Sequence, residues 1–150
     1  MAYSVCDVKG RRVVAFTDGS YCNNVEAYAF SIYVDTGDGL EYVLEESGSC
    51  TLFAGMHNSS GEVEAVYRAC ECAQKLGAVH IKIFTDYTGC KELVYGNWKP
   101  RNYVTLRFVE LMRTLRISYV IEIIKGHSGN ELHNAVDRLA KAATIKASVV

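Results

Sequence analysis

The sequence contains little proline and no large excess of charge of either sign, and each of these features limits the classes of protein to which the chain can belong. The 150 residues include one proline, and no stretch rich in proline, glycine or serine divides the chain. The 16 lysines and arginines nearly balance the 17 aspartates and glutamates, so net charge does not indicate a nucleic-acid partner. Hydrophobic residues make up 49% of the chain. We therefore expect one domain, residues 1–150, with a substantial core.

Long apolar runs and paired cysteine motifs are also missing. No run approaches the roughly 18 apolar residues that span a membrane, and Met1–Lys9 lacks the apolar region of a signal peptide. The six cysteines include no C-x-x-C pair, which argues against a zinc site. Cys70 and Cys72 would point to different sides of one helix. We therefore expect a cytoplasmic protein with no membrane partner and with free, mostly buried thiols.

The first part of the chain is rich in β-branched and aromatic residues. Strands are predicted at Arg12–Thr17, Glu26–Asp35 and Leu40–Phe53, the third with a bulge near Gly48. Short turn signals separate these runs, which indicates an antiparallel meander.

The pattern then changes to apolar residues at three- and four-residue steps. This spacing predicts a helix over Gly61–Leu76, capped by Ser59 or Ser60 and ended by Gly77. Further strands are predicted at His80–Thr85 and Ser118–Ile124, and further helices near Gly89–Tyr95, at Tyr103–Leu115 and at Leu132–Lys146. The order βββαβααβα predicts an α/β fold: a mixed five-stranded sheet with helices on its faces.

Four acidic residues stand at informative places in these elements. Asp18 follows the first strand, Glu62 opens the first helix, Asp86 follows the fourth strand, and Asp137 lies in the last helix. Each alone has a commoner explanation, such as a turn residue, a charge on a helix dipole or a partner of a basic side chain. Together they predict a carboxylate cluster suited to Mg²⁺ or Mn²⁺. Two such ions about 3.5–4 Å apart promote phosphodiester cleavage.

Four motifs, in order, resemble the type 1 ribonuclease H family, especially its bacterial branch. They are Phe16-Thr17-Asp18-Gly19-Ser20, Gly61-Glu62-Val63-Glu64-Ala65, Phe84-Thr85-Asp86-Tyr87, and Lys125-Gly126-His127-Ser128-Gly129 followed by Asn134-Ala135-Val136-Asp137-Arg138-Leu139-Ala140. The last is similar to a K-G-H-x-G…N-x-x-x-D-x-L-A signature, and the segment 96–99 resembles a G-x-W-K stretch. The resemblance covers residues 12–143. It implies the ribonuclease H fold and hydrolysis of the RNA strand of RNA–DNA hybrids, with 5′-phosphate and 3′-hydroxyl ends.

The resemblance also implies roles for single residues. Asp18, Glu62, Asp86 and Asp137 would bind two Mg²⁺ ions, which Mn²⁺ could replace. His127 would assist proton movement or product release, although a lone histidine is more often an ordinary surface residue. Substrate contacts are implied for Gly19, Ser20, Asn24, Asn58, Ser60, Gly61, Trp98, Lys99 and Asn134. Glu64 is interpreted as an exposed surface or capping charge.

Other interpretations stay open at this point. Trp98 would pack on a DNA sugar or anchor the core. Four basic residues near it would bind DNA phosphates or form a solvated face: Lys91, Lys99, Arg101 and Arg107. A non-catalytic domain that binds hybrids or proteins would usually lack one of the four acids. A flavodoxin-like protein needs a glycine-rich phosphate loop that is absent after the first strand. A monomer is expected.

Overall fold

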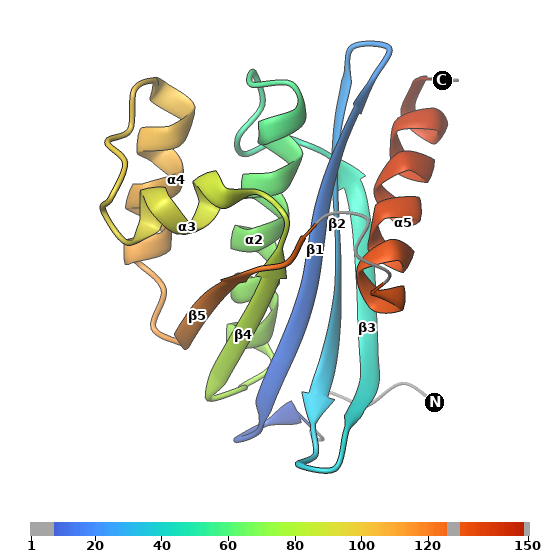
Figure 1. Cartoon of the computed structure of the whole chain (residues 1–150), viewed down its shortest axis with the longest axis vertical. Helices are drawn as coiled ribbons and strands as arrows, with labels where there is room; N and C mark the ends of the chain where they lie inside the picture. Colours follow the sequence, from blue (N-terminus) through green and yellow to red (C-terminus); the bar gives the residue numbers. More distant parts are fainter. Residues whose placement is uncertain (1–7, 126–129, 149–150) are drawn as a thin grey trace.

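The computed structural model describes residues 8–125 and 130–148 and has the mixed α/β architecture that the sequence predicts (Figure 1). Its strands are β1 (Arg12–Cys22), β2 (Val25–Asp35), β3 (Leu40–Ser49), β4 (His80–Thr85) and β5 (Ser118–Ile123). Within the same ranges its helices are α2 (Asn58–Lys75), α3 (Thr88–Val94), α4 (Tyr103–Arg113) and α5 (Glu131–Ser148). The predicted order of elements is confirmed.

The strands form one five-stranded sheet in the order β3-β2-β1-β4-β5, with β1 in the middle. β2 is antiparallel to β1 and β3, whereas β4 is parallel to β1 and β5. The predicted end of β1 at Thr17 is wrong, because β2 pairs with the strand as far as Cys22. Asn23 and Asn24 then form a tight hairpin turn with φ angles of 51° and 64°.

Side chains along β1 alternate between two cores, since successive residues of a strand face opposite sides of the sheet. Val13 and Ala15 belong to the larger core, which the sheet forms with α2 and α4. Val14 and Phe16 belong to a smaller core that includes Val136 of α5. Helix α5 therefore packs on one face of the sheet, and α2, α3 and α4 pack on the opposite face (Figure 1).

The predicted third strand is too long and its irregularity is misplaced. β3 ends at Ser49 rather than Phe53, and the register shift lies beside Ile32 and Tyr33 of β2 rather than near Gly48. The strand ends early because the backbone amides of residues 51–53 bind a carboxylate of α2 instead of a neighbouring strand.

The first helix begins at Asn58, three residues before the predicted start at Gly61. Its N-cap residue is His57, which has a positive φ of 57° and no capping side-chain bond. The predicted caps Ser59 and Ser60 are therefore wrong. Ser60 is buried inside the first turn, where its hydroxyl accepts a hydrogen bond from the loop before the helix.

The remaining predicted elements agree with the structure to within two residues at each end. Gly77 has a φ of 87° just after α2 and ends it, as predicted. The thiols of the described cysteines are free, as predicted, but only Cys70 and Cys90 are fully buried and Cys22 is exposed. No helix in the described ranges combines the length and apolar character needed to cross a membrane.

Two glycines let α2 approach the sheet at the end of β1. A Cβ atom on Gly19 would overlap the backbone nitrogen of Glu62, and one on Gly61 would overlap the carbonyl oxygen of Ala27. Backbone therefore packs on backbone at this point, with no room for a methyl group. The contact fixes where the first turns of α2 stand relative to β1.

Gly61→Ala should destabilise the protein by about 2 kcal/mol or more, because the added methyl group has no space and α2 must shift. Urea unfolding measures the change. Gly39→Ala is the control, because no atom lies within 4 Å of a Cβ there. Equal stability of the two variants would contradict the close packing.

Candidate active site

Two aspartates come together because β1 and β4 run parallel. Phe16 of β1 pairs with Phe84 of β4, and their rings stack with centroids 5.2 Å apart on the α5 side of the sheet. Asp18 in β1 and Asp86 just after β4 each follow their phenylalanine by two residues, so the alternation of side chains directs both carboxylates to the same face. The β1–β4 pairing ends with these phenylalanines, while β1 continues along β2. The two carboxylates therefore lie close together at the point where β1 and β4 cease to pair.

The other two acids arrive from the helices. Glu62 lies in the first turns of α2, which the contact between Gly19 and Gly61 holds against β1. Asp137 lies on α5, with its Oδ2 3.0 Å from Nζ of Lys141. The side chain of Asp18 interacts with Glu62, Asp86 and Asp137. The four predicted acids therefore form one cluster, with Asp18 at its centre.

The proximity of these acids changes their proton affinities. Burial raises the pKa of Asp18 to about 7; contact with Glu62 opposes this shift, and Asp137 and Asp86 add to it. Burial, and then the charge of Asp18, raise the pKa of Glu62 well above its usual value. For Asp137 burial is the largest single influence and opposes ionisation, but the interactions with Lys141, Asp18 and His133 together outweigh it and lower the pKa. Without a cation, this cluster retains protons near neutral pH.

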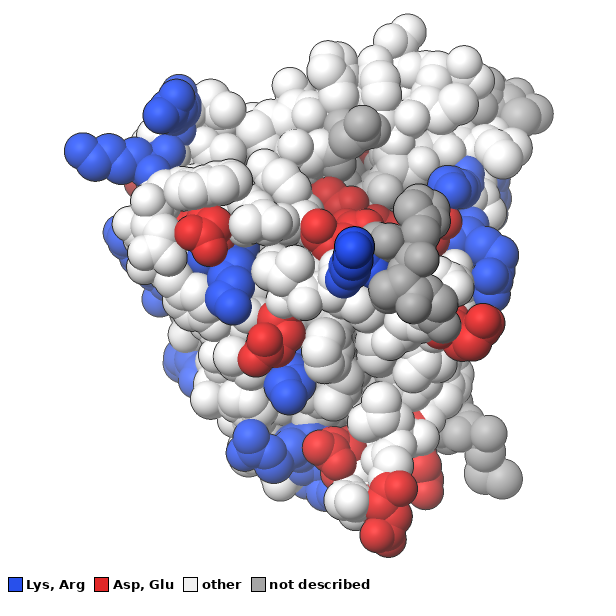
Figure 2. Space-filling view, in the orientation of Figure 1, with Lys and Arg blue, Asp and Glu red and all other residues white. Residues whose placement is uncertain are grey.

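These carboxylates suit a divalent cation. Their oxygens are hard donors of the kind that Mg²⁺ and Mn²⁺ prefer, and Oε2 of Glu62 is buried with no hydrogen-bond partner. Figure 2 shows acidic atoms gathered in the middle of one face, with basic side chains both directly beside them and toward the edges of the face. A cation here would satisfy the unpaired oxygen and neutralise the mutual repulsion.

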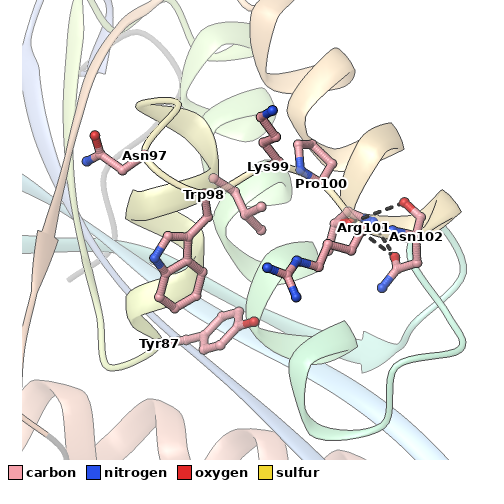
Figure 3. Close-up of a pocket in the computed structure, with 9 residues that line it drawn as sticks. Tyr87, Asn97, Trp98, Lys99, Pro100, Arg101 and Asn102 are labelled. Atoms are coloured by element: carbon pink, nitrogen blue, oxygen red, sulfur yellow. Dashed lines mark hydrogen bonds between the residues drawn. The ribbon is translucent and has the colours of Figure 1, made fainter.

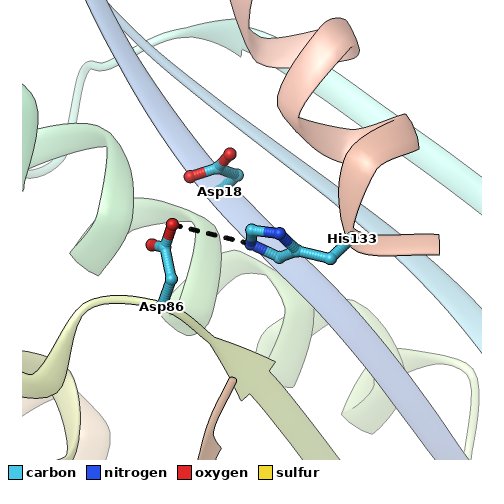
Figure 4. A group of neighbouring side chains, drawn as sticks. All are labelled: Asp18, Asp86 and His133. Atoms are coloured by element: carbon cyan, nitrogen blue, oxygen red, sulfur yellow. Dashed lines mark ion pairs between the residues drawn. The ribbon is translucent and has the colours of Figure 1, made fainter. Parts of the chain in front are cut away.

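A histidine that the sequence analysis missed also points into the cluster. His133 of α5 is 4% exposed, and its Nε2 lies 3.8 Å from Oδ2 of Asp86 without a hydrogen-bond partner (Figure 4). In the N-x-x-x-D signature the asparagine stands four residues before the aspartate. Counted back from Asp137, that position is His133, so the earlier match of Asn134 to the signature asparagine was wrong by one position. Helical spacing reveals it, because residues four apart share a face.

Glu64 is not the surface or capping charge that the sequence predicts. It is completely buried, and its carboxylate accepts hydrogen bonds from the backbone amides of Thr51, Leu52 and Phe53 and from Nε of Arg68. The loop after β3 is thus tied to α2. Glu62 and Glu64 are two residues apart, so one faces the acidic cluster and the other anchors the fold.

The predicted substrate contacts are dispersed around the cluster. Gly19 and Ser20 lie on β1 next to Asp18, half-buried, and Asn24 is exposed in the β1–β2 turn, where its side chain accepts a hydrogen bond from Tyr21. Asn134 is half-buried on α5. His127 and the side chain of Asn58 lie outside the described residues. The predicted roles of all these residues in substrate binding or catalysis stay predictions.

Trp98 does not anchor the core. It is 48% exposed and lines a groove of about 790 Å³ between α3 and α4, together with Tyr87, Lys99 and Arg101. In Figure 3 the guanidinium group of Arg101 extends in the direction of the two aromatic rings. The groove thus combines aromatic surface with positive charge, to which Lys91 and Arg107 do not contribute as lining residues.

Comparison with known proteins gives a consistent match. The family model for RNase H matches residues 10–145. The chain is similar to the N-terminal RNase H domain of rv2228c from Mycobacterium tuberculosis, with 21% identity over 93% of this chain and 97% of that one and a TM-score of 0.70. It is also similar to RNase H1 from the halophilic archaeon Halobacterium salinarum NRC-1, with 23% identity over 90% and 98% and a TM-score of 0.67.

A third similar structure is LC11-RNase H1, which was solved in complex with an RNA/DNA hybrid. Its identity is 19% over 90% of this chain and 98% of that chain, with a TM-score of 0.68. No curated protein sequence matches the chain. The structural matches share the fold, and the family model covers all four acids of the cluster.

Glu64→Gln should destabilise the protein by about 3 kcal/mol, because Arg68 and the bound amides lose a buried charged acceptor. Denaturant unfolding gives the value. Glu71→Gln on the same helix is the control: its pair with Lys75 is 3.7 Å long and partly exposed, so a change below about 0.5 kcal/mol is expected. If both variants lose equally little, Glu64 does not anchor the loop.

Asp18→Asn should stabilise the metal-free protein at pH 8. The pKa of Asp18 rises from 3.8 to about 7 on folding, so ionisation opposes folding increasingly as the pH rises between these values and fully above about 7. We expect a gain of about 1–3 kcal/mol at pH 8 that shrinks by pH 5. Thermal unfolding in chelator at both pH values, with the exposed-turn variant Asp38→Asn as control, measures it. A lower melting temperature of Asp18→Asn at pH 8 would refute the cost of ionising this buried carboxyl group.

Proposed function

The chain belongs to the RNase H family, and from this premise we propose that its acidic centre hydrolyses the RNA strand of RNA–DNA hybrids with two bound divalent cations. Hydrolysis would break the bond between phosphorus and the 3′ oxygen, which leaves a 3′-hydroxyl and a 5′-phosphate. The single observation that supports the proposal is the grouping of Asp18 with three other acids, from α2, from the end of β4 and from α5, with ligand atoms of Asp18 and Asp86 within 4.8 Å of each other.

Asp18, Glu62, Asp86 and Asp137 would hold the cations. Bound there, divalent cations supply an activated water and neutralise the negative charge that develops on the phosphate. Asp18 is 3% exposed and interacts with the other three acids, so its carboxylate would bind a cation together with them. Glu62 is placed by the packing of α2 on β1, and Asp137 is oriented by Lys141. Mg²⁺ is the expected ion, and Mn²⁺ is the expected substitute.

Recognition of a hybrid requires contacts to both strands. The 2′-hydroxyls of RNA are read in the minor groove, and the backbone at Gly19, Ser20 and Gly61 lies beside the acids that would cut this strand. The groove beside Trp98 suits the DNA strand: the exposed indole offers a surface for a sugar, and Lys99 and Arg101 offer charge for phosphates. The similarity to LC11-RNase H1, solved with a hybrid, supports this substrate.

The monomeric state, the cytoplasmic location and the single domain over residues 1–150 remain predictions of the sequence. The role of His127 as a mobile helper in catalysis is likewise a proposal that rests on the family signature around it.

Purified protein should cut a labelled RNA–DNA hybrid in Mg²⁺, and leave single-stranded RNA, double-stranded RNA and double-stranded DNA intact. Asp86→Asn should lower the rate at least about 10³-fold, because several kcal/mol of transition-state stabilisation depend on the cations. Asp38→Asn, which removes an exposed turn charge, should cut at the wild-type rate.

Analysis of the product ends tests the direction of cleavage: the downstream RNA fragment should carry a 5′-phosphate. Binding of the hybrid without cutting in either Mg²⁺ or Mn²⁺ would favour a non-catalytic domain. Cutting that survives in Asp86→Asn would mean that the acidic cluster is not the catalytic centre.

A further inference from the structure

We propose that His133 is a nitrogen ligand for a divalent transition-metal ion that Asp18 and Asp86 also bind, so that the centre holds Mn²⁺ or Co²⁺ more tightly than its carboxylates alone would. The inference deepens the proposed function, because it concerns the same centre. It assigns to this site a donor of a different chemical kind from the four acids.

The geometry brings the imidazole within reach of such an ion. One ligand atom each from Asp18, Asp86 and His133 lie within 4.8 Å of one another, and Nε2 of His133 is 3.8 Å from Oδ2 of Asp86. Two atoms bound to one ion through bonds of about 2.0–2.2 Å are separated by about 3–4.3 Å. The pair thus already has the spacing of two ligands, and an oxygen of Asp18 lies within 4.8 Å of both (Figure 4).

The imidazole is not satisfied by the protein. At 3.8 Å its approach to Asp86 is too long for a hydrogen bond, and Nε2 is buried without a partner among the described residues. A buried polar atom without a partner costs about 1–3 kcal/mol, and native structures rarely contain one without a reason. A ligand bond to a cation gives Nε2 the partner that it lacks.

The position of His133 is firmly fixed. Its backbone amide donates a hydrogen bond to Oδ1 of Asn130 at the start of α5, and the neighbouring Leu132 and Val136 pack in the smaller core against β1. Asp137 stands one turn later on the same helix and interacts electrostatically with His133. One helix thus presents an imidazole and a carboxylate to the same centre.

A nitrogen donor changes which ions the centre favours. Mg²⁺ is bound through oxygen ligands and retains water, whereas imidazole suits transition-metal ions, whose affinity for mixed nitrogen and oxygen sites exceeds that of Mg²⁺. His133 should therefore add affinity for Mn²⁺ and Co²⁺ and little for Mg²⁺.

The experiment measures metal binding without substrate. Mn²⁺, Co²⁺ and Mg²⁺ are titrated into the metal-free forms of wild type, His133→Asn and His80→Asn. His80→Asn is the control, because His80 lies at the start of β4 and its side chain contacts Ser118. We expect the Mn²⁺ and Co²⁺ dissociation constants to rise about tenfold in His133→Asn. The Mg²⁺ constant should change less than twofold, and His80→Asn should match wild type throughout.

A spectroscopic measurement on the wild type needs no variant to fold. Pulsed electron paramagnetic resonance of bound Mn²⁺ should show coupling to a histidine nitrogen, and the coupling should disappear in His133→Asn and persist in His80→Asn. Mn²⁺ bound without nitrogen coupling in wild type would overturn the proposal. Equal Mn²⁺ affinity in His133→Asn and wild type would overturn it as well.

These outcomes are separate from those of the proposed function. Nitrogen coupling in a protein that cuts no hybrid would uphold the ligand and refute the nuclease. Hybrid cleavage in Mg²⁺ with no nitrogen coupling in Mn²⁺ would refute the ligand and uphold the nuclease.

Discussion

The parallel pairing of β1 with β4 is the contact on which the whole candidate centre depends. It stacks Phe16 on Phe84 and so sets Asp18 and Asp86 beside each other on one face. The pairing then ends, and the sheet leaves room between the strands for helix-borne side chains. Burial, and to a lesser degree the nearby Asp137 and Asp86, raise the pKa of Asp18. Ionising these buried carboxylates therefore costs folding free energy, which a bound cation would offset.

Two glutamates on one helix show how closely structural and functional roles can be interleaved. Glu62 and Glu64 are the same type of residue and stand two positions apart in the sequence. One contributes to the acidic cluster, and the other binds three backbone amides and Arg68 on the opposite side of α2. The backbone contact between Gly19 and Gly61 fixes the position of α2 relative to β1, and this position determines where both carboxylates lie.

Sequence reasoning predicted the element order, the sheet class and the four acids, because hydrophobic periodicity and the motifs around the acids are local signals. It failed where one segment is stabilised by another that lies far away in the chain. The burial of Glu64 depends on the loop after β3, and the continuation of β1 depends on β2. His133 was missed because a shift of one position drew attention to Asn134. The sequence left open whether Trp98 anchors the core or faces a substrate, and only its exposure in the structure excludes the core.

The core beneath α5 is small. Among the described residues this core contains five buried residues, fewer than the larger core on the other face of the sheet. Elements with little buried surface open by local unfolding more readily than the rest of a protein. A cation bound between α5 and the strands would act as a cross-link that closes this opening. Amide hydrogen exchange in α5 should then slow with metal concentration, and by thermodynamic reciprocity any contact that tightens α5 on the sheet should also strengthen metal binding.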